Sequence, residues 1–432
     1  MKLVCATLSA VSLVVCATTL ARGGEWPRYL GPTGTGVIEA GEKVARSWPA
    51  GGPKELWSVK VGEGFGAAAI ARGKVHLLDR RDNQQDVLRV LSLETGESVW
   101  EHSYPTANFK GSHGGSRGTP TVDGDRAYTV GVMGELHCFD LAAKKVAWSK
   151  SLPKDFGAEP GPWGFAQSPL IVGDTVVVAA PGDSTGLIAL DKQSGETRWK
   201  SKAFGTGDTY TSPILVTLDG KEQIVNWHRE AVAGINPKDG ALLWTYKWRT
   251  NRPIPQPLAT GDSRLFLTIG YGGGSSMIQV SKSDGDAWNA TELFQDDRSG
   301  SGVSTPLFYQ GHIYTNSHDK RRGLQCLDAG GEVKWETERT PQFGLGSMII
   351  ADGVIFIVNG DTGELVMAEA SPAGYKELAR AKVLGGSDIW APLALSNGKL
   401  VLRDQSQMKC VEVGNEAAGA NGGGGAVETK GS

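Results

Sequence analysis

Residues 167–199 read QSPLIVGDTVVVAAPGDSTGLIALDKQSGETRW, and this stretch decides the fold. It opens on Ser168-Pro169, passes through short runs rich in Val, Ile, Leu and Ala, and closes on Trp199. Gly and Asp separate the runs and favour tight turns, so the pattern predicts short β-strands joined by hairpins. The same unit recurs from Gly118-Thr119-Pro120 to Trp148, from Thr211-Ser212-Pro213 to Trp244, and from Ser304-Thr305-Pro306 to Trp335.

The closing tryptophans recur at a steady interval. They are Trp57, Trp100, Trp148, Trp199, Trp244 and Trp335, with gaps of 43, 48, 51, 45 and 91 residues. The last gap spans two units, the first of which passes Trp288 and ends near Phe294. A further unit ends near Leu378, and residues 390–413 have room for only three more strands. Four strands for roughly every 45 residues are typical of a propeller blade.

The sequence therefore predicts an all-β, eight-bladed β-propeller with four-stranded antiparallel blades. The strand around Leu56–Val59 supplies the fourth strand of the C-terminal blade, which closes the ring and removes its open edges. An unclosed solenoid is the alternative. The repeat unit also assigns each closing tryptophan a structural role. Trp199 follows the turn at Asp191 and Gly195, so its ring is expected to dock on the next blade and its indole N–H to donate a hydrogen bond.

The ends of the chain are predicted to lie outside the propeller. Lys2 and the uncharged run Leu3–Leu20 predict a cleaved signal peptide over residues 1–23, with a retained membrane anchor as the alternative. An N-terminal extension follows at 24–55, the propeller occupies 56–413, and a disordered Gly-rich tail occupies 414–432. No second stretch is long and apolar enough to span a bilayer. The protein is expected to be exported to the periplasm or secreted.

Composition excludes several functions. Glycine accounts for 60 of 432 residues and is spread along the chain, which indicates many turns. The net charge is -3 and the sequence has no basic stripe, so we expect no nucleic-acid partner. Outside the predicted signal peptide the cysteines are Cys138, Cys326 and Cys410, which are far apart and favour core packing over a disulfide framework. We expect no metal site.

The Ala-x-Asp-x-x-Ser/Thr-Gly-x-x-x-Trp pattern resembles the repeat of PQQ-like (quinoprotein-type) propellers. That repeat occurs both in quinoprotein dehydrogenases and in BamB, the non-enzymatic subunit of the outer-membrane assembly machinery. The resemblance covers nearly all of residues 50–413, and Glu25–Val37 resembles the start of exported, planctomycete-type members of the family. It implies the fold; function is open, because this fold hosts both enzymes and scaffolds.

Candidate binding residues come from the loops that enter each blade beside the axis. We expect these loops to form a rim of aromatic and cationic side chains suited to a planar or anionic ligand or to a peptide. The rim candidates are His113, Arg117, Trp163, Gln167, Tyr210, Arg252, Arg298 and Trp390. A merely solvated rim is the alternative.

The prediction for function is a binding or scaffold propeller that contacts a protein or peptide partner of the cell envelope through its rim loops. Catalytic residues are not assigned, and the protein is expected to be a monomer. One alternative is a small PQQ-dependent oxidoreductase, although the adjacent cysteine pair of quinoprotein alcohol dehydrogenases is absent from the sequence. Another is a propeller that binds carbohydrate or another polymer.

Overall fold

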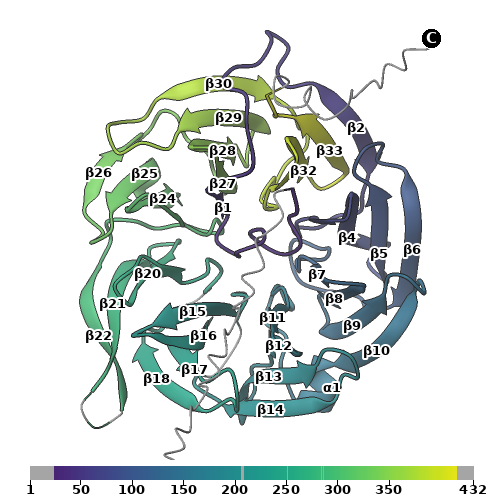
Figure 1. Ribbon diagram of the computed structural model, residues 1–432, viewed down its shortest axis with the longest axis vertical. Coiled ribbons are helices and arrows are strands. Elements are labelled where there is room, and N and C mark those ends of the chain that lie inside the picture. The colour runs from purple at the N-terminus through teal and green to yellow at the C-terminus, as the bar shows by residue number, and fades with distance from the viewer. Residues whose placement is uncertain (1–23, 206–208, 251, 284, 286, 416–432) are drawn as a thin grey trace, which may run out of the picture.

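The described residues form eight antiparallel sheets arranged radially around a central axis (Figure 1). The structure is a computed structural model that describes residues 24–205, 209–250, 252–283, 285 and 287–415. The predicted eight-bladed propeller is therefore confirmed. The predicted signal peptide, residues 1–23, lies outside the described residues, and so does residue 416 onward of the predicted tail.

The blades follow the order of the chain. Blades 1 to 4 comprise β3 (Ala69–Ala71), β4 (Lys74–Arg81), β5 (Gln85–Ser92) and β6 (Ser98–Pro105); β7 (Thr121–Asp123), β8 (Arg126–Val130), β9 (Glu135–Asp140) and β10 (Lys145–Ser151); β11 (Leu170–Val172), β12 (Thr175–Ala179), β13 (Thr185–Asp191) and β14 (Thr197–Lys202); and β15 (Ile214–Leu218), β16 (Lys221–His228), β17 (Ala231–Ile235) and β18 (Leu242–Lys247).

Blades 5 to 8 complete the ring. They comprise β19 (Leu258–Ala259), β20 (Arg264–Ile269), β21 (Gly274–Lys282) and β22 (Trp288–Asp296); β23 (Leu307–Tyr309), β24 (His312–Ser317), β25 (Gly323–Asp328) and β26 (Val333–Glu336); β27 (Met348–Ala351), β28 (Val354–Val358), β29 (Glu364–Glu369) and β30 (Glu377–Lys382); and β31 (Ala394–Ser396), β32 (Lys399–Arg403) and β33 (Gln407–Glu412) with β2 (Glu55–Lys60). The short helix α1 (Leu152–Phe156) and the 3-10 turn η1 (Asp319–Arg321) lie between strands.

The ring closes where the two ends of the chain share blade 8. Strand β2 pairs antiparallel with β33, which sets Ser58 opposite Lys409 and Trp57 opposite Cys410. In Figure 1 the purple β2 lies beside the yellow β33. This pairing is the one that the sequence predicts, and it makes β2 the outermost strand of the blade that β31, β32 and β33 begin.

Each blade is hydrophobic on both faces because it is packed between two others. In β12 the run Val176–Ala179 is fully buried, whereas buried and exposed residues alternate in the outer strand β14. Runs of β-branched residues suit such two-sided burial. The short apolar segments of the sequence therefore mark the inner and middle strands, and the tryptophans stand on the outer ones.

The outer-strand tryptophans contact the following blade. The Trp148 indole donates to the Lys192 carbonyl at 3.2 Å, and the Trp199 indole donates to the Pro237 carbonyl at 3.0 Å. Trp57 and Trp335 donate in the same way to Leu93 and Ser371. The remaining two differ, because Trp244 donates to Gln223 of its own blade and Trp100 meets the ring of Phe139 edge-on. In blade 5, Phe294 takes the place of the missing tryptophan against Gly331.

The N-terminal extension crosses the axis of the propeller. Trp26 is fully buried and forms a bridge with Ile70, after which the chain runs over the centre (Figure 1). Strand β1 (Val37–Ile38) then pairs parallel with β27, so blade 7 has a fifth strand that the sequence does not predict. At the other end, two residues of the predicted tail are hydrogen bonded: the Gly414 N–H donates to the Gly398 carbonyl and the Asn415 N–H donates to the Lys43 carbonyl.

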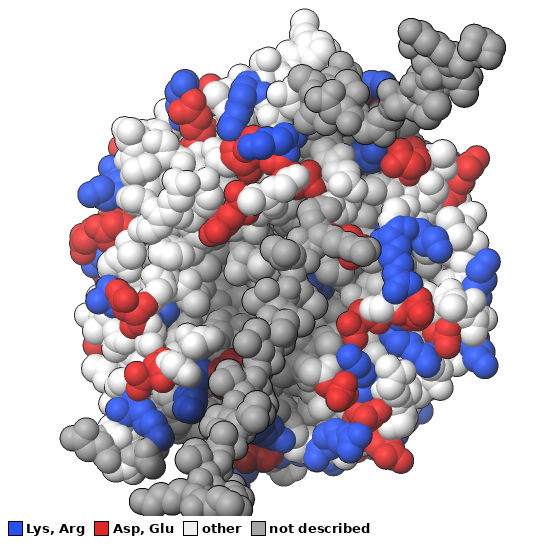
Figure 2. Space-filling view, viewed as in Figure 1, with Lys and Arg blue, Asp and Glu red and all other residues white. Residues whose placement is uncertain are grey.

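Charges of both signs lie mainly around the circumference of the visible face. Figure 2 shows Lys and Arg interspersed with Asp and Glu around the circumference, with white residues between them. Many charged side chains of the described residues form ion pairs, such as Arg198 with Asp191 and Lys376 with Glu369. Among the described residues, no helix has the length and apolar character needed to cross a bilayer.

Candidate functional site

The loops that enter the inner strands meet at one mouth of the central channel and enclose a cavity of about 390 Å³. We call it the channel-mouth pocket. Its described lining consists of Tyr29, Phe65, His113, Arg117, Trp163, Ala166, Ser168, Tyr210, Ser212, Arg252, Ile254, Tyr271, Val303, Leu345, Trp390 and Pro392. Aromatic rings and two guanidinium groups dominate this set, and it contains no Asp, Glu or Cys.

One wall of the pocket is a stack of rings. Phe65 precedes blade 1 and Trp390 precedes blade 8, and their centroids lie 5.0 Å apart with nearly parallel planes. The His113 ring lies 5.2 Å from Trp390. Loops of three blades therefore supply one continuous aromatic surface.

Arg117 lies beside this wall with its guanidinium between two rings, at 5.3 Å from Phe65 and 5.2 Å from Phe109. It donates to the backbone carbonyls of Gly115, at 2.9 Å, and of His113. Burial lowers the pKa of Arg117 to about 10, and nearby Tyr210 and Glu63 act in the opposite direction. The side chain is therefore fixed in place and remains positively charged at neutral pH.

Arg252 is the second cation of the pocket. Its guanidinium lies 4.4 Å from the Trp163 ring and 4.9 Å from the Tyr271 ring. The Trp163 indole donates to Ser112 at 3.2 Å, and the Trp163 ring meets Tyr210 edge-on at 5.4 Å. Cation–π contacts of this kind hold a guanidinium in a fixed plane without neutralising it.

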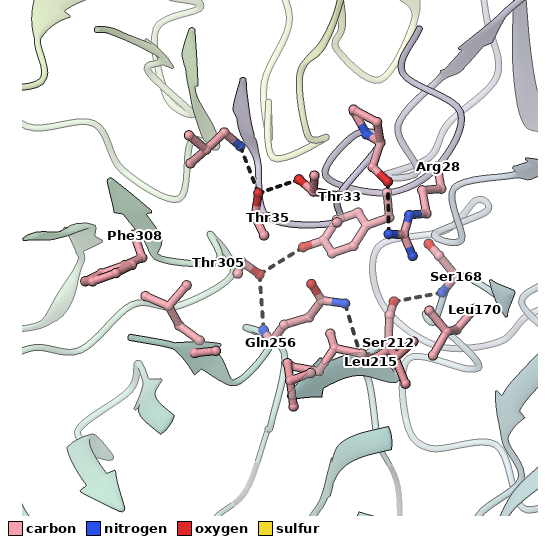
Figure 3. A pocket seen from close by; sticks show the side chains of 18 of the residues that line it. Arg28, Thr33, Thr35, Ser168, Leu170, Ser212, Leu215, Gln256, Thr305 and Phe308 are labelled. Atoms are coloured by element: carbon pink, nitrogen blue, oxygen red, sulfur yellow. Dashed lines mark hydrogen bonds between the residues drawn. The ribbon is translucent and has the colours of Figure 1, made fainter. Parts of the chain in front are cut away.

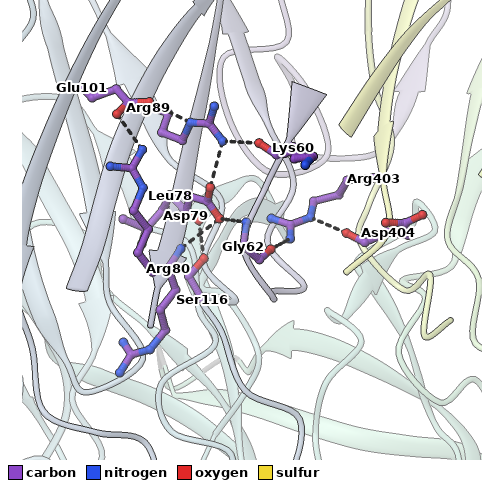
Figure 4. A network of polar contacts seen from close by, with 11 residues as sticks. Lys60, Gly62, Leu78, Asp79, Arg80, Arg89, Glu101, Ser116, Arg403 and Asp404 are labelled. Atoms are coloured by element: carbon purple, nitrogen blue, oxygen red, sulfur yellow. Dashed lines mark hydrogen bonds and ion pairs between the residues drawn. The ribbon is translucent and has the colours of Figure 1, made fainter. Parts of the chain in front are cut away.

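The loops under the aromatic wall are held by a buried polar network (Figure 4). Asp79 accepts hydrogen bonds from the backbone N–H of Gly62 and from the Arg89 side chain, at 2.9 and 3.0 Å. Arg403 of blade 8 is almost fully buried and donates to the Gly62 carbonyl at 2.5 Å. Ser116 donates to the Leu78 carbonyl. This network fixes the chain on both sides of Phe65 and ties blade 1 to blade 8.

A second cavity of about 500 Å³ lies on the other side of the same ring of residues. It is lined by the N-terminal segment 24–40 and by the beginnings of inner strands (Figure 3). Tyr29, Ser168 and Ser212 line both cavities. The Tyr29 hydroxyl is hydrogen bonded to Thr305 at 3.0 Å. The channel is thus divided into two stacked cavities, and Tyr29 lies between them.

The Ser/Thr-Pro motifs of the sequence join neighbouring blades near the axis. The Ser168 hydroxyl accepts from the Thr119 N–H at 2.9 Å, and the Ser212 hydroxyl accepts from the Ser168 N–H at 2.8 Å. Thr119 and Thr305 accept in the same way from Ala67 and Gln256. Each hydroxyl therefore joins its blade to the preceding one. We call these four residues, Thr119, Ser168, Ser212 and Thr305, the hydroxyl relay.

Six predicted rim residues lie together in the channel-mouth pocket. They are His113, Arg117, Trp163, Tyr210, Arg252 and Trp390. Gln167 does not: its side chain is 1% exposed and its amide bonds both the N–H and the carbonyl of Ala179 within blade 3.

Arg298 also lies away from the pocket, and its assignment to the rim is corrected. Strand β22 runs as far as Asp296 and the inner strand β23 begins only at Leu307, so Arg298 lies at the outer end of the connecting loop, next to the outermost strand of blade 5. There it pairs with Asp296 and Glu332, at 2.6 and 2.8 Å, and lies 4.0 Å from the Phe294 ring. It supports the docking contact between blades 5 and 6.

Several lining residues were not predicted. Phe65 occupies the position before blade 1 that Trp390 occupies before blade 8, and the flanking Gly64 and Gly66 are a signal that could have identified it. Tyr271 belongs to the turn between β20 and β21 and is 49% exposed. Tyr29 comes from the N-terminal extension, and its contact with Thr305 spans 276 residues, which no local pattern reveals.

The described residues offer few ligands for a metal. No group of three or more His, Cys, Asp or Glu converges among them. Cys138, Cys326 and Cys410 are free, buried and located in the strands β9, β25 and β33. Burial raises the pKa of Cys138 and Cys326 to about 11 and that of Cys410 to about 12, so these thiols remain protonated at neutral pH.

One protein family and several solved structures are similar to this chain. The family described as outer membrane protein assembly factor BamB matches residues 83–254. The BamB structure from Moraxella catarrhalis is 15% identical with a TM-score of 0.58, over 83% of this chain and 97% of that one. Quinohemoprotein alcohol dehydrogenase from Comamonas testosteroni is 13% identical with a TM-score of 0.64, over 92% and 81%.

A europium-containing methanol dehydrogenase is 13% identical with a TM-score of 0.60, over 88% of this chain and 89% of that one. None of the curated protein sequences matches the chain. At these identities the structural likeness establishes the shared propeller and leaves the activity open.

Proposed function

The chain is a PQQ-like β-propeller, and on that premise we propose that it is a non-catalytic binding protein of the cell envelope that holds a partner protein in the channel-mouth pocket. The observation that carries this proposal is the composition of the pocket. Trp163, Trp390, Tyr210, Arg117 and Arg252 converge on one cavity. Trp, Tyr and Arg are the residue types that dominate the energetics of protein interfaces.

The pocket is also preorganised for binding. Arg117 is fixed between two rings and bonded to the backbone, and Phe65 is stacked on Trp390. Side chains already fixed in their bound arrangement lose less conformational entropy when a ligand arrives. The described lining provides rings, hydroxyls, two guanidinium groups and one imidazole, which suits recognition.

The test is recovery of the partner from native envelope by chemical crosslinking, with Trp390→Ala compared to Leu293→Ala. Leu293 is 50% exposed on the outer strand β22, outside the pocket lining, and serves as the control. We expect Trp390→Ala and Arg117→Ala to recover at least about tenfold less partner, which corresponds to about 1.4 kcal/mol of binding energy. Equal recovery from wild type and both pocket variants would place the binding surface elsewhere.

The second candidate is a PQQ-dependent oxidoreductase, favoured by a pocket on the axis that combines planar rings with cationic groups. The residues present fit that cofactor only in part. Arg117 and Arg252 suit an anionic ring system, but the described lining has no carboxylate to hold Ca²⁺ beside it, and the three described cysteines lie in the strands.

The two candidates are separated by adding PQQ and Ca²⁺ to the purified protein. The binding proposal expects unchanged absorbance and no dye-linked turnover of alcohols or sugars. A stoichiometric quinone complex with turnover would establish the oxidoreductase instead. Carbohydrate recognition is tested by adding soluble oligosaccharides to the crosslinking assay. If the aromatic rim binds sugar, the added oligosaccharides should compete with the partner and lower its recovery.

A further inference from the structure

We infer that the channel-mouth pocket takes the C-terminal end of a partner chain, with the terminal carboxylate at the guanidinium groups that line the pocket and an aromatic or large apolar last side chain against the rings. This inference rests on the proposed function and specifies its ligand. Three features of the pocket lead to it: a closed floor, an uncompensated positive charge and a restricted volume.

The floor of the pocket blocks the path along the axis. Tyr29 lines this cavity and the one below it, and its hydroxyl is hydrogen bonded to Thr305. Segment 24–40 covers the far side, with Trp26 fully buried against blade 1. An extended chain therefore cannot thread the propeller, and only a chain end or a single projecting group reaches the floor.

The positive charge of the pocket has no carboxylate partner among the described residues. Neither Arg117 nor Arg252 forms an ion pair there, although many arginines on the outer strands do. Glu63 acts on Arg117 only at longer range. Arg117 donates to the carbonyls of Gly115, His113 and, at 3.4 Å, Ser112. These bonds use only part of its donor set, so donors remain for a ligand. Guanidinium groups that line a ring-walled site favour a carboxylate over a neutral amide.

The volume limits what accompanies that carboxylate. A cavity of about 390 Å³ is near the lower end of the range for small-ligand sites, which indicates one or two residues of a chain. The Phe65–Trp390 stack and the Trp163 ring both present flat apolar surfaces to the pocket. A terminal aromatic side chain matches those surfaces and leaves its own carboxylate beside the guanidinium groups.

The experiment uses a fluorescein-labelled probe peptide, Gly-Ser-Gly-Ser-Leu-Phe, on the full protein. Three forms are compared by fluorescence anisotropy: the free acid, the C-terminal amide, and the free acid extended by Gly-Ser-Gly. We expect the amide and the extended form to bind at least about tenfold more weakly than the free acid, because each removes the carboxylate from the last aromatic residue.

Arg252→Gln is expected to abolish the preference for the free acid, whereas Arg252→Lys keeps part of it by keeping the charge. The matched control is Arg198→Gln, which removes an exposed arginine from the outer strand of blade 3 and leaves binding unchanged. Circular dichroism and the thermal midpoint of each variant report whether the fold is retained.

Each outcome decides a separate point. Equal binding of acid and amide, still lost in Trp390→Ala, would overturn the chain-end inference while the proposed function stands. Stronger binding of the extended form would show that an internal segment is recognised and would overturn it likewise. Binding of all three forms unaffected by Trp390→Ala and Arg252→Gln would remove the pocket as the site and contradict both proposals.

Discussion

Arg117 shows how a single side chain is prepared for binding. Rings on two sides lower its exposure, and burial lowers its pKa to about 10, yet it keeps its charge at neutral pH. Two backbone carbonyls fix its position. The same residue type behaves differently at Arg298, whose carboxylate partners neutralise it on the outer edge. Residue type alone therefore does not define the site; the partners around each residue do.

His228 gives a prediction at the same scale. It is fully buried against Phe204, and among the described residues neither ring nitrogen has a hydrogen-bond partner. Burial lowers its pKa to about 3. The folded state therefore stays neutral at His228 while the unfolded chain takes up a proton below its ordinary pKa of about 6.5. The neutral His228 therefore contributes its full stability above the unfolded pKa of about 6.5. That contribution is lost progressively as the pH falls from this value toward the folded pKa of about 3.

His228→Phe is accordingly expected to flatten the pH dependence of unfolding. Between about pH 6.5 and pH 4 the slope of the free energy of unfolding should fall by up to about 1.4 kcal/mol per pH unit. Urea unfolding at several pH values measures it. An unaltered slope in His228→Phe would mean that this imidazole is charged in the folded protein.

The turn before each closing tryptophan is the element that joins the blades. Gly195 has a φ of 74°, and a Cβ added there would lie 2.7 Å from the Trp148 ring of the preceding blade. A glycine is therefore favoured for two reasons: its backbone has a positive φ, and the Trp148 ring leaves no room for a Cβ. In blade 2, Lys144 holds this position with a φ of 54°, so the conformation persists where the glycine does not.

Gly195→Ala and Gly173→Ala separate these two requirements. Both glycines have positive φ, but a Cβ at Gly173 meets nothing within 4 Å. We expect Gly173→Ala to cost about 1 kcal/mol for the backbone alone. Gly195→Ala should cost about 2–4 kcal/mol, because the Trp148 ring must also move. Urea midpoints report both, and equal losses would show that the ring contact contributes nothing.

The hydroxyl relay gives a second prediction for elements. Thr119→Val keeps the shape of the side chain but leaves the buried Ala67 N–H without its acceptor. The expected loss is about 1–3 kcal/mol in the free energy of unfolding, which is the cost of an unsatisfied buried donor. Thr245→Val, at an exposed position of β18, is the control and should change stability by less than about 0.5 kcal/mol. A Thr119→Val variant as stable as this control would remove the relay from the account.

The whole molecule depends on blade 8 being shared by the two ends of the chain. Ser58 and Lys409 are opposite each other in β2 and β33, at a spacing that suits a disulfide. The double variant Ser58→Cys, Lys409→Cys should crosslink on oxidation and gain about 2–4 kcal/mol of stability, lost again with a reductant. The thermal midpoint with and without reductant measures this. Failure of the two thiols to crosslink in the folded protein would contradict the pairing.

The repeat is predictable from sequence because its signals are local. Ser168-Pro169, Gly195 and Trp199 lie within one unit and define its strands and its docking contact. Most of the rim could be predicted from the sequence for the same reason, because the position of a loop within the repeat places that loop beside the axis. The prediction that Arg298 belongs to the rim was wrong because the length of β22 decides where that residue lies. Tyr29 and β1 were missed because the N-terminal extension binds strands far along the chain.

The central claim is that the channel-mouth pocket is the surface that meets the partner. A photoreactive amino acid at Tyr271, which is exposed at the edge of the pocket, tests it most directly when compared with the same group at Leu293 on the outer strand. Irradiation in native envelope should attach one protein species at position 271 and not at position 293, and Trp390→Ala should abolish the product. Labelling that is equal at both positions, or found only at position 293, would contradict the account.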